Sequence, residues 1–418
     1  MILKKLHNKV AGALSLFIPA LAFIFLWSQC SKNIPERKHF TVASYYFPNY
    51  HVDPRNEKIH GTGWSEWELV KAARPRFPGH RQPKVPLWGY TDESDAKVMA
   101  KKIDAAADHG IDVFIFDWYY YNGKPFLQAA LENGFIHAKN RDRLKFALMW
   151  ANHDWLNIHP RHLDIKPQLL FPGTVSPKVF EKMTNYIVEN YFKNPAYWQI
   201  HGKPYFSIYE LQTLVKSFGG LDATRQALDR FRQKTRAAGF SGLHLNAVIW
   251  GNPILPGETR VKNATELVDY LGFDSVSSYV WVHHVRLPDF PQTPYSYVQK
   301  KYFEYAKRAE KEFHVPYFPN VTMGWDSSPR CAQDDPFVNK GYPFMATVSK
   351  NTPEAFKKAL LEMKTFLQNR PDNEKIFTIN CWNEWTEGSY LEPDKVNGMK
   401  YLEAVRDVFA REDKEEQK

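Results

Sequence analysis

The chain has 418 residues and a formal net charge of +9, from 55 Lys and Arg against 46 Asp and Glu. Its basic residues are scattered among acidic ones without a long cationic block, so we expect no nucleic-acid partner. A hydrophobic content of 44% permits one large core, and 13 Trp, 22 Tyr and 29 Phe favour a protein that stacks aromatic rings on sugars.

The first 30 residues have the pattern of an export signal. Three lysines precede an apolar run from about residue 11 to residue 27, and Ser28 and Gln29 then lead to Cys30. A basic start and a short apolar run are typical of a secretory signal, and the cysteine makes residues 1–30 similar to a bacterial lipoprotein signal. We therefore expect a lipid on Cys30, a polar tether over 31–40, and attachment to a cell-envelope membrane, facing the periplasm or the outer surface. An uncleaved membrane anchor is the alternative.

From residue 41 onward, apolar runs of strand length alternate with stretches in which apolar residues recur every three or four positions. Strands are expected at 42–47, 113–116, 144–149, 205–209, 243–249, 273–279, 316–321 and 376–380, and the clearer helices at 94–109, 178–192, 222–238, 296–313 and 352–368. Ser94 and Thr352 are the expected N-caps, and Gly110, Gly202 and Gly239 lie just past expected helix ends.

Eight strands alternating with helices predict an α/β fold, a (β/α)8 TIM barrel. It would form a single catalytic domain over residues 41–410, followed by a charged tail at 411–418, and we expect a monomer. A doubly wound open sheet is the structural alternative, but no Gly-x-Gly-x-x-Gly follows any strand. The first loop, at 48–90, is far longer than ordinary connections and is expected to form a lid or a binding wall.

In such a barrel the chemistry lies at the C-terminal ends of the strands. Those ends are rich in aromatic, acidic and amide side chains: Tyr46, His51, Asp117, Trp118, Trp150, Asn152, Tyr209, Glu210, Tyr279, Trp325 and Asp326. Each has an ordinary structural explanation, such as rim packing for a tryptophan or capping for an aspartate. Their gathering on one face favours a site that binds a sugar.

The strongest signal follows the last strand, where Glu384 and Glu387 stand three apart between tryptophans. Glycosidic bond cleavage needs such a pair, because one carboxyl protonates the leaving oxygen and the other assists attack at the sugar carbon. Residues three apart on a strand face opposite sides, so the chain must turn after about Trp382 for both to enter one cleft. Burial would keep a proton on one glutamate while the other stays ionised, and we assign Glu387 as the acid and Glu384 as the base. Two solvated carboxylates on a turn are the alternative.

Two other residue types carry less information. The neighbouring histidines His283 and His284 lack the His-Glu-x-x-His spacing of a zinc site, so we expect no metal and no cofactor. Cys331 and Cys381 both fall at loop ends on the same face. A disulfide between them is compatible with an oxidising compartment, but two unpaired thiols are the favoured expectation.

The run 382–388, with 391–393, resembles glycoside hydrolase family 99 and its bacterial WbsX-like relatives. Further matches lie at 46–51, 63–67, 79–83, 150–152 and 324–330, which together span nearly the whole chain past the tether. The resemblance adds Trp64, Glu66, Trp67, Trp382 and Asn383 to the expected substrate-binding residues.

This resemblance implies retaining hydrolysis of α-mannosidic linkages without a metal. Glu384 would deprotonate the sugar 2-hydroxyl, which then attacks its own anomeric carbon to give a 1,2-anhydro sugar. Glu387 would protonate the departing oxygen and later activate water. The characterised mannosidases have His where this chain has Thr386, so the mannose specificity transfers less firmly than the acid pair.

The leading hypothesis is therefore a hydrolase of an α-linked, manno-configured oligosaccharide or polysaccharide. A glycosyltransferase or transglycosylase is the first alternative, since WbsX-like proteins have been labelled glycosyltransferases. The sequence has no Asp-x-Asp, the common nucleotide-diphosphate ligand of many transferases. A non-catalytic glycan-binding barrel is the third hypothesis, and the presence of both glutamates argues against it.

Overall fold

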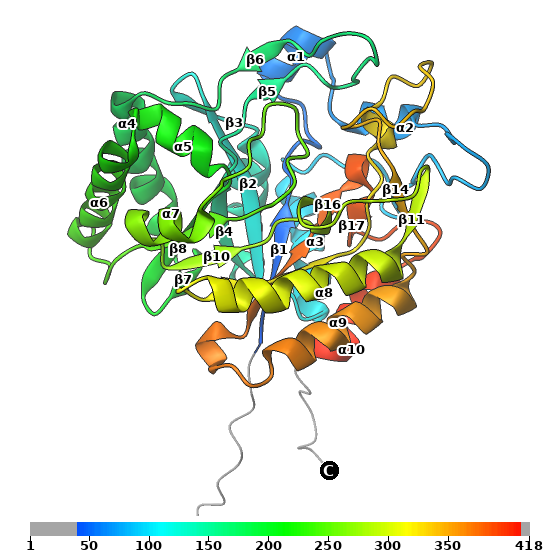
Figure 1. Ribbon diagram of the computed structural model, residues 1–418. Helices are drawn as coiled ribbons and strands as arrows, with labels where there is room; N and C mark the ends of the chain where they lie inside the picture. The colour runs from blue at the N-terminus through cyan, green and yellow to red at the C-terminus, as the bar shows by residue number, and fades with distance from the viewer. Residues whose placement is uncertain (1–39, 411–418) are drawn as a thin grey trace, which may run out of the picture. The chain divides into compact units, whose positions relative to one another are not determined.

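The structure, a computed structural model, describes residues 40–410 (Figure 1). The expected signal with Cys30, all of the tether but Phe40, and the tail at 411–418 lie outside the described residues. Within the described part, no helix combines the length and the apolar character that crossing a bilayer requires.

One parallel sheet forms the centre of the molecule. Its strands are β1 (Thr41–Tyr46), β2 (Val113–Tyr121), β4 (Lys145–Trp150), β8 (Lys203–Ile208), β9 (His244–Val248), β10 (Ser275–Ser277), β12 (Tyr317–Phe318), β13 (Asn320–Thr322) and β15 (Ile376–Asn380). Their order is β12-β10-β9-β8-β4-β2-β1-β15-β13. β12 and β13 are separated only by Pro319, which has no N–H to give to a ladder, and together they occupy one barrel position.

This pairing closes the sheet into a barrel. β12 pairs with β10 on one side and β13 pairs with β15 on the other, while β15 continues to β1 through the register Thr41↔Ile376. Each of the eight expected apolar runs contributes to one of the eight positions. The predicted (β/α)8 barrel is therefore confirmed, and the open-sheet alternative is wrong.

Helices surround the barrel (Figure 1). The expected ones form as α3 (Ala96–Asp108), α4 (Pro177–Ile187) continued by the π-helical η3 (Val188–Phe192), α6 (Leu221–Ala237), α8 (Tyr295–Glu312) and α9 (Pro353–Leu367). Those not expected are α1 (Pro54–His60), α2 (Trp67–Ala72), α5 (Leu211–Phe218), α7 (Ala264–Leu271) and α10 (Lys400–Phe409). Four of these have eight residues or fewer, too short for a clear helical repeat.

Two of the expected caps are wrong. Asp95, not Ser94, caps α3, because its carboxylate accepts from the Lys97 amide at 2.7 Å. Gly202 lies in the turn between β7 (Gln199–Ile200) and β8 rather than after a helix. The caps expected at Thr352, Gly110 and Gly239 are confirmed.

Short elements lie at the end of the barrel where the parallel strands finish. They are β3 (Lys124–Phe126), β5 (Trp155–Leu156), β6 (Leu169–Phe171), η4 (Trp281–His283), β11 (Gln292–Pro294), η5 (Ser328–Arg330), β14 (Thr347–Ser349), β16 (Asn383–Glu384), η7 (Trp385–Glu387) and β17 (Ser389–Tyr390). The π-helical η1 (Ala130–Phe135) packs instead beside α3 on the outside of the barrel, and η2 (Arg141–Arg143) and η6 (Asp372–Glu374) precede β4 and β15. Cys331 and Cys381 are both buried free thiols, as favoured.

The core has two layers because side chains alternate along each strand. Inside the barrel, the Tyr45 ring lies 4.7 Å from that of Tyr279. Outside it, Trp150 packs against Phe180 of α4. This alternation decides which strand-end residues reach the site.

Candidate active site

A small hairpin presents the two glutamates. After β15 the chain forms β16, turns through η7 and returns as β17, with Glu384 paired to Ser389. The turn closes at Gly388, whose φ of +64° is left-handed. A Cβ there would lie 2.7 Å from the Cβ of Asp326, so glycine is required by contact as well as by conformation. The expected turn after Trp382 is present, and it brings both carboxylates to one place.

Arg330 from η5 joins the two carboxylates. Its Nη2 donates to Glu384 Oε1 at 2.8 Å and its Nη1 donates to Glu387 Oε1 at 2.7 Å. Tyr342 also donates its hydroxyl to Glu387 Oε1, at 2.7 Å. All four side chains are buried. One guanidinium therefore fixes the relative position of the pair.

A third carboxylate, Glu66, lies behind this group. Arg330 Nε donates to Glu66 Oε1 at 2.8 Å, and the Thr386 hydroxyl donates to the same oxygen at 2.5 Å. Burial alone would raise the pKa of Glu66, but Arg330, His159 and Thr386 together hold it below its usual value. Glu66 thus stays ionised, and it contacts the same Nη2 of Arg330 that Glu384 contacts.

Burial shifts the pKa of both glutamates in the same direction. Burial raises the pKa of Glu384 well above its usual value; Arg330 opposes this rise, and the neighbouring Glu387 adds to it. Burial also raises the pKa of Glu387, against the opposing effects of Arg330 and Tyr342. Burial thus raises the pKa of both glutamates, and Arg330 opposes the rise at each of them. The assignment of Glu387 as the acid and Glu384 as the base stays a prediction.

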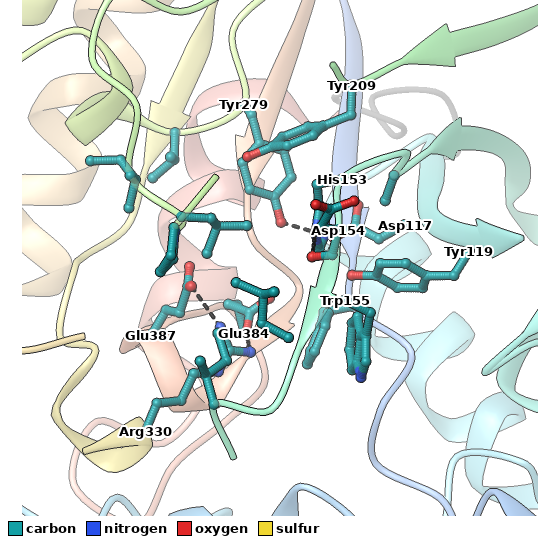
Figure 2. Close-up of a pocket in the computed structure, with 18 of the residues that line it drawn as sticks. Asp117, Tyr119, His153, Asp154, Trp155, Tyr209, Tyr279, Arg330, Glu384 and Glu387 are labelled. Atoms are coloured by element: carbon teal, nitrogen blue, oxygen red, sulfur yellow. Dashed lines mark hydrogen bonds and ion pairs between the residues drawn. The ribbon is translucent and has the colours of Figure 1, made fainter. Parts of the chain in front are cut away.

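A pocket opens in front of the pair (Figure 2). Its empty volume is about 710 Å³, which includes space open to solvent. The wall comes from strand ends and from the loops after β4 and β9: Phe47, Asp117, Tyr119, Met149, His153, Asp154, Trp155, His159, Tyr209, Ile254, Leu255, Tyr279, His283, Trp325, Arg330, Glu384 and Glu387 are among its residues. Aromatic faces and carboxyl groups together suit a sugar ring with its hydroxyls.

Asp117 lies across the pocket from the glutamate pair (Figure 2). Tyr279 donates its hydroxyl to Asp117 Oδ2 at 2.8 Å, while Oδ1 is buried and has no hydrogen-bond partner. Burial raises the pKa of Asp117 well above its usual value, an effect that Tyr279 opposes and Glu387 increases. Buried polar atoms are nearly always hydrogen-bonded, so an unsatisfied oxygen at a pocket wall indicates a ligand.

Comparison with known proteins fixes the family. The family model described as glycosyltransferase WbsX matches residues 42–405. The chain belongs to the WbsX family. The WxcX proteins of Xanthomonas campestris pv. campestris, strains B100 and ATCC 33913, are uncharacterized and are each 26% identical to it over 380 residues. That alignment covers 90% of this WbsX-family chain and 51% of theirs, so the chain spans about half the length of these curated relatives.

Solved structures show the same fold. A glycoside hydrolase-like protein aligns with a TM-score of 0.54 and 16% identity, over 89% of this chain and 94% of that one. The GH99 endo-alpha-mannosidase from Bacteroides thetaiotaomicron, in complex with BIS-TRIS-propane, aligns with a TM-score of 0.51 and 14% identity. The alignment covers 88% of this chain and 97% of that one. The family 99-like and WbsX-like resemblance is therefore confirmed, with the barrel as the shared feature.

Six of the expected site residues line the pocket of this WbsX-family barrel: Asp117, Tyr209, Tyr279, Trp325, Glu384 and Glu387. Trp118 and Trp150 do not, because strand alternation turns them outward. Trp118 donates its indole N–H to Tyr191 at 3.1 Å, and Trp150 packs on α4.

Other expected residues support the site from behind. The side-chain amide of Asn383 accepts from the Phe47 backbone N–H and donates to the Phe47 carbonyl. The side-chain amide of Asn152 makes the same two hydrogen bonds to the backbone of Glu210. Trp382 donates to Glu392, and Trp67 lies between Tyr50 and Trp385.

The remaining expected residues make separate contacts. Tyr46 donates to Glu93, which also contacts His51. Trp64 stacks on His60, and Asp326 accepts from Gln82 and contacts His80. Glu210 lines a neighbouring polar pocket with Asp154 and Thr213.

Sequence reasoning missed Arg330 and Tyr342 as site residues. Arg330 stands at the end of the matched run 324–330, but no local pattern links it to glutamates more than 50 positions away. Tyr119 and Trp155 were also missed, although Tyr119 stands two positions after Asp117 on the same strand and so shares its face. The first loop contributes Glu66 behind the site, whereas the loops after β4 and β9 supply the pocket wall.

Proposed function

We propose that this chain is a glycoside hydrolase that cleaves α-linked, manno-configured glycans with Glu384 and Glu387. The observation that carries the proposal is the convergence of both carboxyls on one guanidinium at the base of an aromatic-lined pocket. Two carboxyls facing one cavity can supply the acid and the base of glycosidic cleavage.

The proposed roles follow the resemblance. Glu384 takes the proton of the sugar 2-hydroxyl while that oxygen attacks the anomeric carbon, and Glu387 gives a proton to the leaving oxygen. Water, deprotonated by Glu387, then opens the 1,2-anhydro sugar. Burial raises the pKa of Glu387, which supports a proton on this carboxyl for the leaving oxygen. Arg330 contacts both carboxyls and would stabilise Glu384 as it ionises.

Sugar transfer is the second candidate, and the family description favours it. A nucleoside diphosphate sugar would bring a negatively charged diphosphate. Arg330 is the one Lys or Arg among the described residues of the pocket wall, and three carboxylates already engage it. This charge balance supports a neutral or cationic ligand and hydrolysis over transfer from a sugar nucleotide.

The test is digestion of a panel of α-linked manno- and gluco-configured oligosaccharides, with the first released anomer followed by NMR. The proposal expects cleavage of α-mannosides with the α configuration retained. An inverted product contradicts the two-step route. Glycan extension from a sugar nucleotide, without hydrolysis, supports the transferase instead.

A further inference from the structure

The loop after β9 forms part of the pocket wall. It runs from residue 249 to residue 263, between β9 and α7, without a helix or strand. Residues 254–258, here called the loop tip, include Ile254, Leu255 and Pro256, which line the pocket. Loops of this length inside a compact domain are usually functional. The position of the loop tip therefore sets one boundary of the space that a sugar would fill.

Burial fixes the loop tip only in part. Ile254, Leu255 and Pro256 are half-buried. Ile254 also borders a second hollow, lined by Arg260 among others, and Pro256 borders the polar hollow that contains Glu210. A segment with space on more than one side has fewer packed neighbours to hold it. Polar contacts must therefore contribute to its position.

Glu258 makes these contacts. Its Oε2 accepts from the backbone N–H of Ile254 at 2.7 Å and of Leu255 at 2.9 Å. Its Oε1 accepts from the hydroxyl of Tyr209, the residue after β8, at 2.6 Å. The Glu258 amide donates to the Leu255 carbonyl at 3.2 Å, which closes the loop tip into a turn. One buried carboxyl group thus ties the loop tip to the end of another strand.

Tyr209 links this carboxyl group to the rest of the wall. It lies across the pocket from Glu384 and Glu387 (Figure 2). Its ring centroid is 5.5 Å from that of Tyr279, which also lines the pocket. Glu258 is not among the described residues that line the pocket. It can therefore act on a ligand only through the residues that it holds.

We propose that Glu258 is a positioning residue, which holds the loop tip and Tyr209 in the arrangement that binds the sugar. Its hold on the loop stands on the contacts above, and its effect on kinetics rests on the proposed hydrolase. His283, whose Nε2 lies 3.9 Å from Glu258 Oε2, is too distant to take over these hydrogen bonds.

Hydrogen exchange of the full chain at pH 8 tests the hold on the loop. Burial raises the pKa of Glu258 to about 7, so the carboxylate form predominates at this pH. Glu258→Ala leaves two amides without their acceptor, and we expect them to exchange at least about tenfold faster. Glu258→Gln keeps an acceptor oxygen for both amides and should stay close to wild type. Glu266→Ala, which removes an exposed acceptor of Asn263 outside the loop tip, is the matched control.

Kinetics on a glycan that the wild-type chain cleaves test the role in binding. Glu258→Ala should raise KM about tenfold while kcat changes by less than about threefold, because the wall is loosened but the glutamate pair is untouched. Glu258→Gln should restore KM to near the wild-type value. A change confined to kcat would assign Glu258 to the chemical step and overturn the proposal.

The wild-type chain decides the matter even if Glu258→Ala does not fold. The amides of Ile254 and Leu255 should exchange more slowly than that of Gly257, which has no hydrogen-bond partner among the described residues. Equal exchange at these three positions, or wild-type exchange in Glu258→Ala, overturns the proposal. If no glycan is cleaved, the proposed hydrolase is wrong, and slow exchange that Glu258→Ala abolishes would still support the hold on the loop.

Discussion

At the scale of single residues, Arg330 determines the geometry of the site. It is buried and contacts Glu66, Glu384 and Glu387 through a planar fork of donors. A lysine ammonium keeps the charge but is a single point on a flexible stem, so it cannot hold three carboxylates in place. The arginine is thus proposed to position the pair rather than to react.

Arg330→Lys should therefore lower kcat/KM by about 10²-fold, the cost of misplacing reactive groups. It should also reduce stability by about 3 kcal/mol, because a buried carboxylate loses its partner. Steady-state kinetics and thermal unfolding measure the two effects. Arg74→Lys is the matched control, since it changes an exposed pair with Asp334. Wild-type kinetics for Arg330→Lys would contradict the positioning role.

Glu384 makes a prediction about pH. Its pKa in the folded protein is raised above that in the unfolded chain, mainly by burial. Its contribution to stability is therefore fully present below the unfolded pKa and is lost as the pH rises through the folded pKa. Glu384→Gln removes this ionisation, so the variant should unfold at a higher temperature than wild type at pH 8. The difference should shrink at pH 4.5. A destabilised variant at pH 8 would contradict the electrostatic account.

At the scale of elements, the hairpin from β16 to β17 places both glutamates. The turn needs Gly388 for its left-handed conformation and for its contact with Asp326. Gly398 is also left-handed, with φ of +58°, but nothing lies within 4 Å of a Cβ placed there. A comparison of substitutions at the two glycines therefore separates the cost of the left-handed conformation from the cost of the contact with Asp326.

Gly388→Ala should cost about 1–3 kcal/mol more stability than Gly398→Ala, because overpacking adds to the strain that both share. It should also lower turnover, since the hairpin must shift away from Asp326. Denaturant unfolding and kinetics of both variants test this. Equal destabilisation by the two substitutions would show that the contact with Asp326 is relaxed without cost.

Strands were predictable from sequence because each barrel position carries its own apolar run, such as 376–380. Short helices were not: α5 and α7 have eight residues each, with little room for a repeat. The direction of strand-end side chains was predictable in principle. Asp117 and Tyr119 share one face of β2, and Trp118 between them must point outward.

The long-range part of the site could not be read from local patterns. Arg330 and Glu66 meet Glu384 only because the barrel brings the loops after different strands to one end. The glutamates themselves were predictable, since the pair follows the last strand directly. Their pKa values depend on burial by distant segments, so spacing in the sequence alone could not assign the acid and base roles.

At the scale of the whole molecule, the chain combines a closed barrel with an N-terminal segment that the structure does not describe. We propose that this segment attaches the protein to a membrane of the cell envelope through a lipid on Cys30. Cys30→Ala should move the protein from the membrane fraction to the soluble fraction, because the site of lipidation is gone. Cell fractionation with immunoblotting measures this. Membrane retention of the variant would favour the uncleaved anchor.

The central claim is that Glu384 and Glu387 together break a glycosidic bond, and kinetics of their glutamine variants test it most directly. Glutamine keeps the shape but cannot exchange the proton. We predict that Glu384→Gln and Glu387→Gln each lower kcat by at least about 10²-fold, with the fold and glycan binding retained. Glu68→Gln, a surface change next to Lys71, should match wild type. Wild-type turnover by both pocket variants would contradict the account.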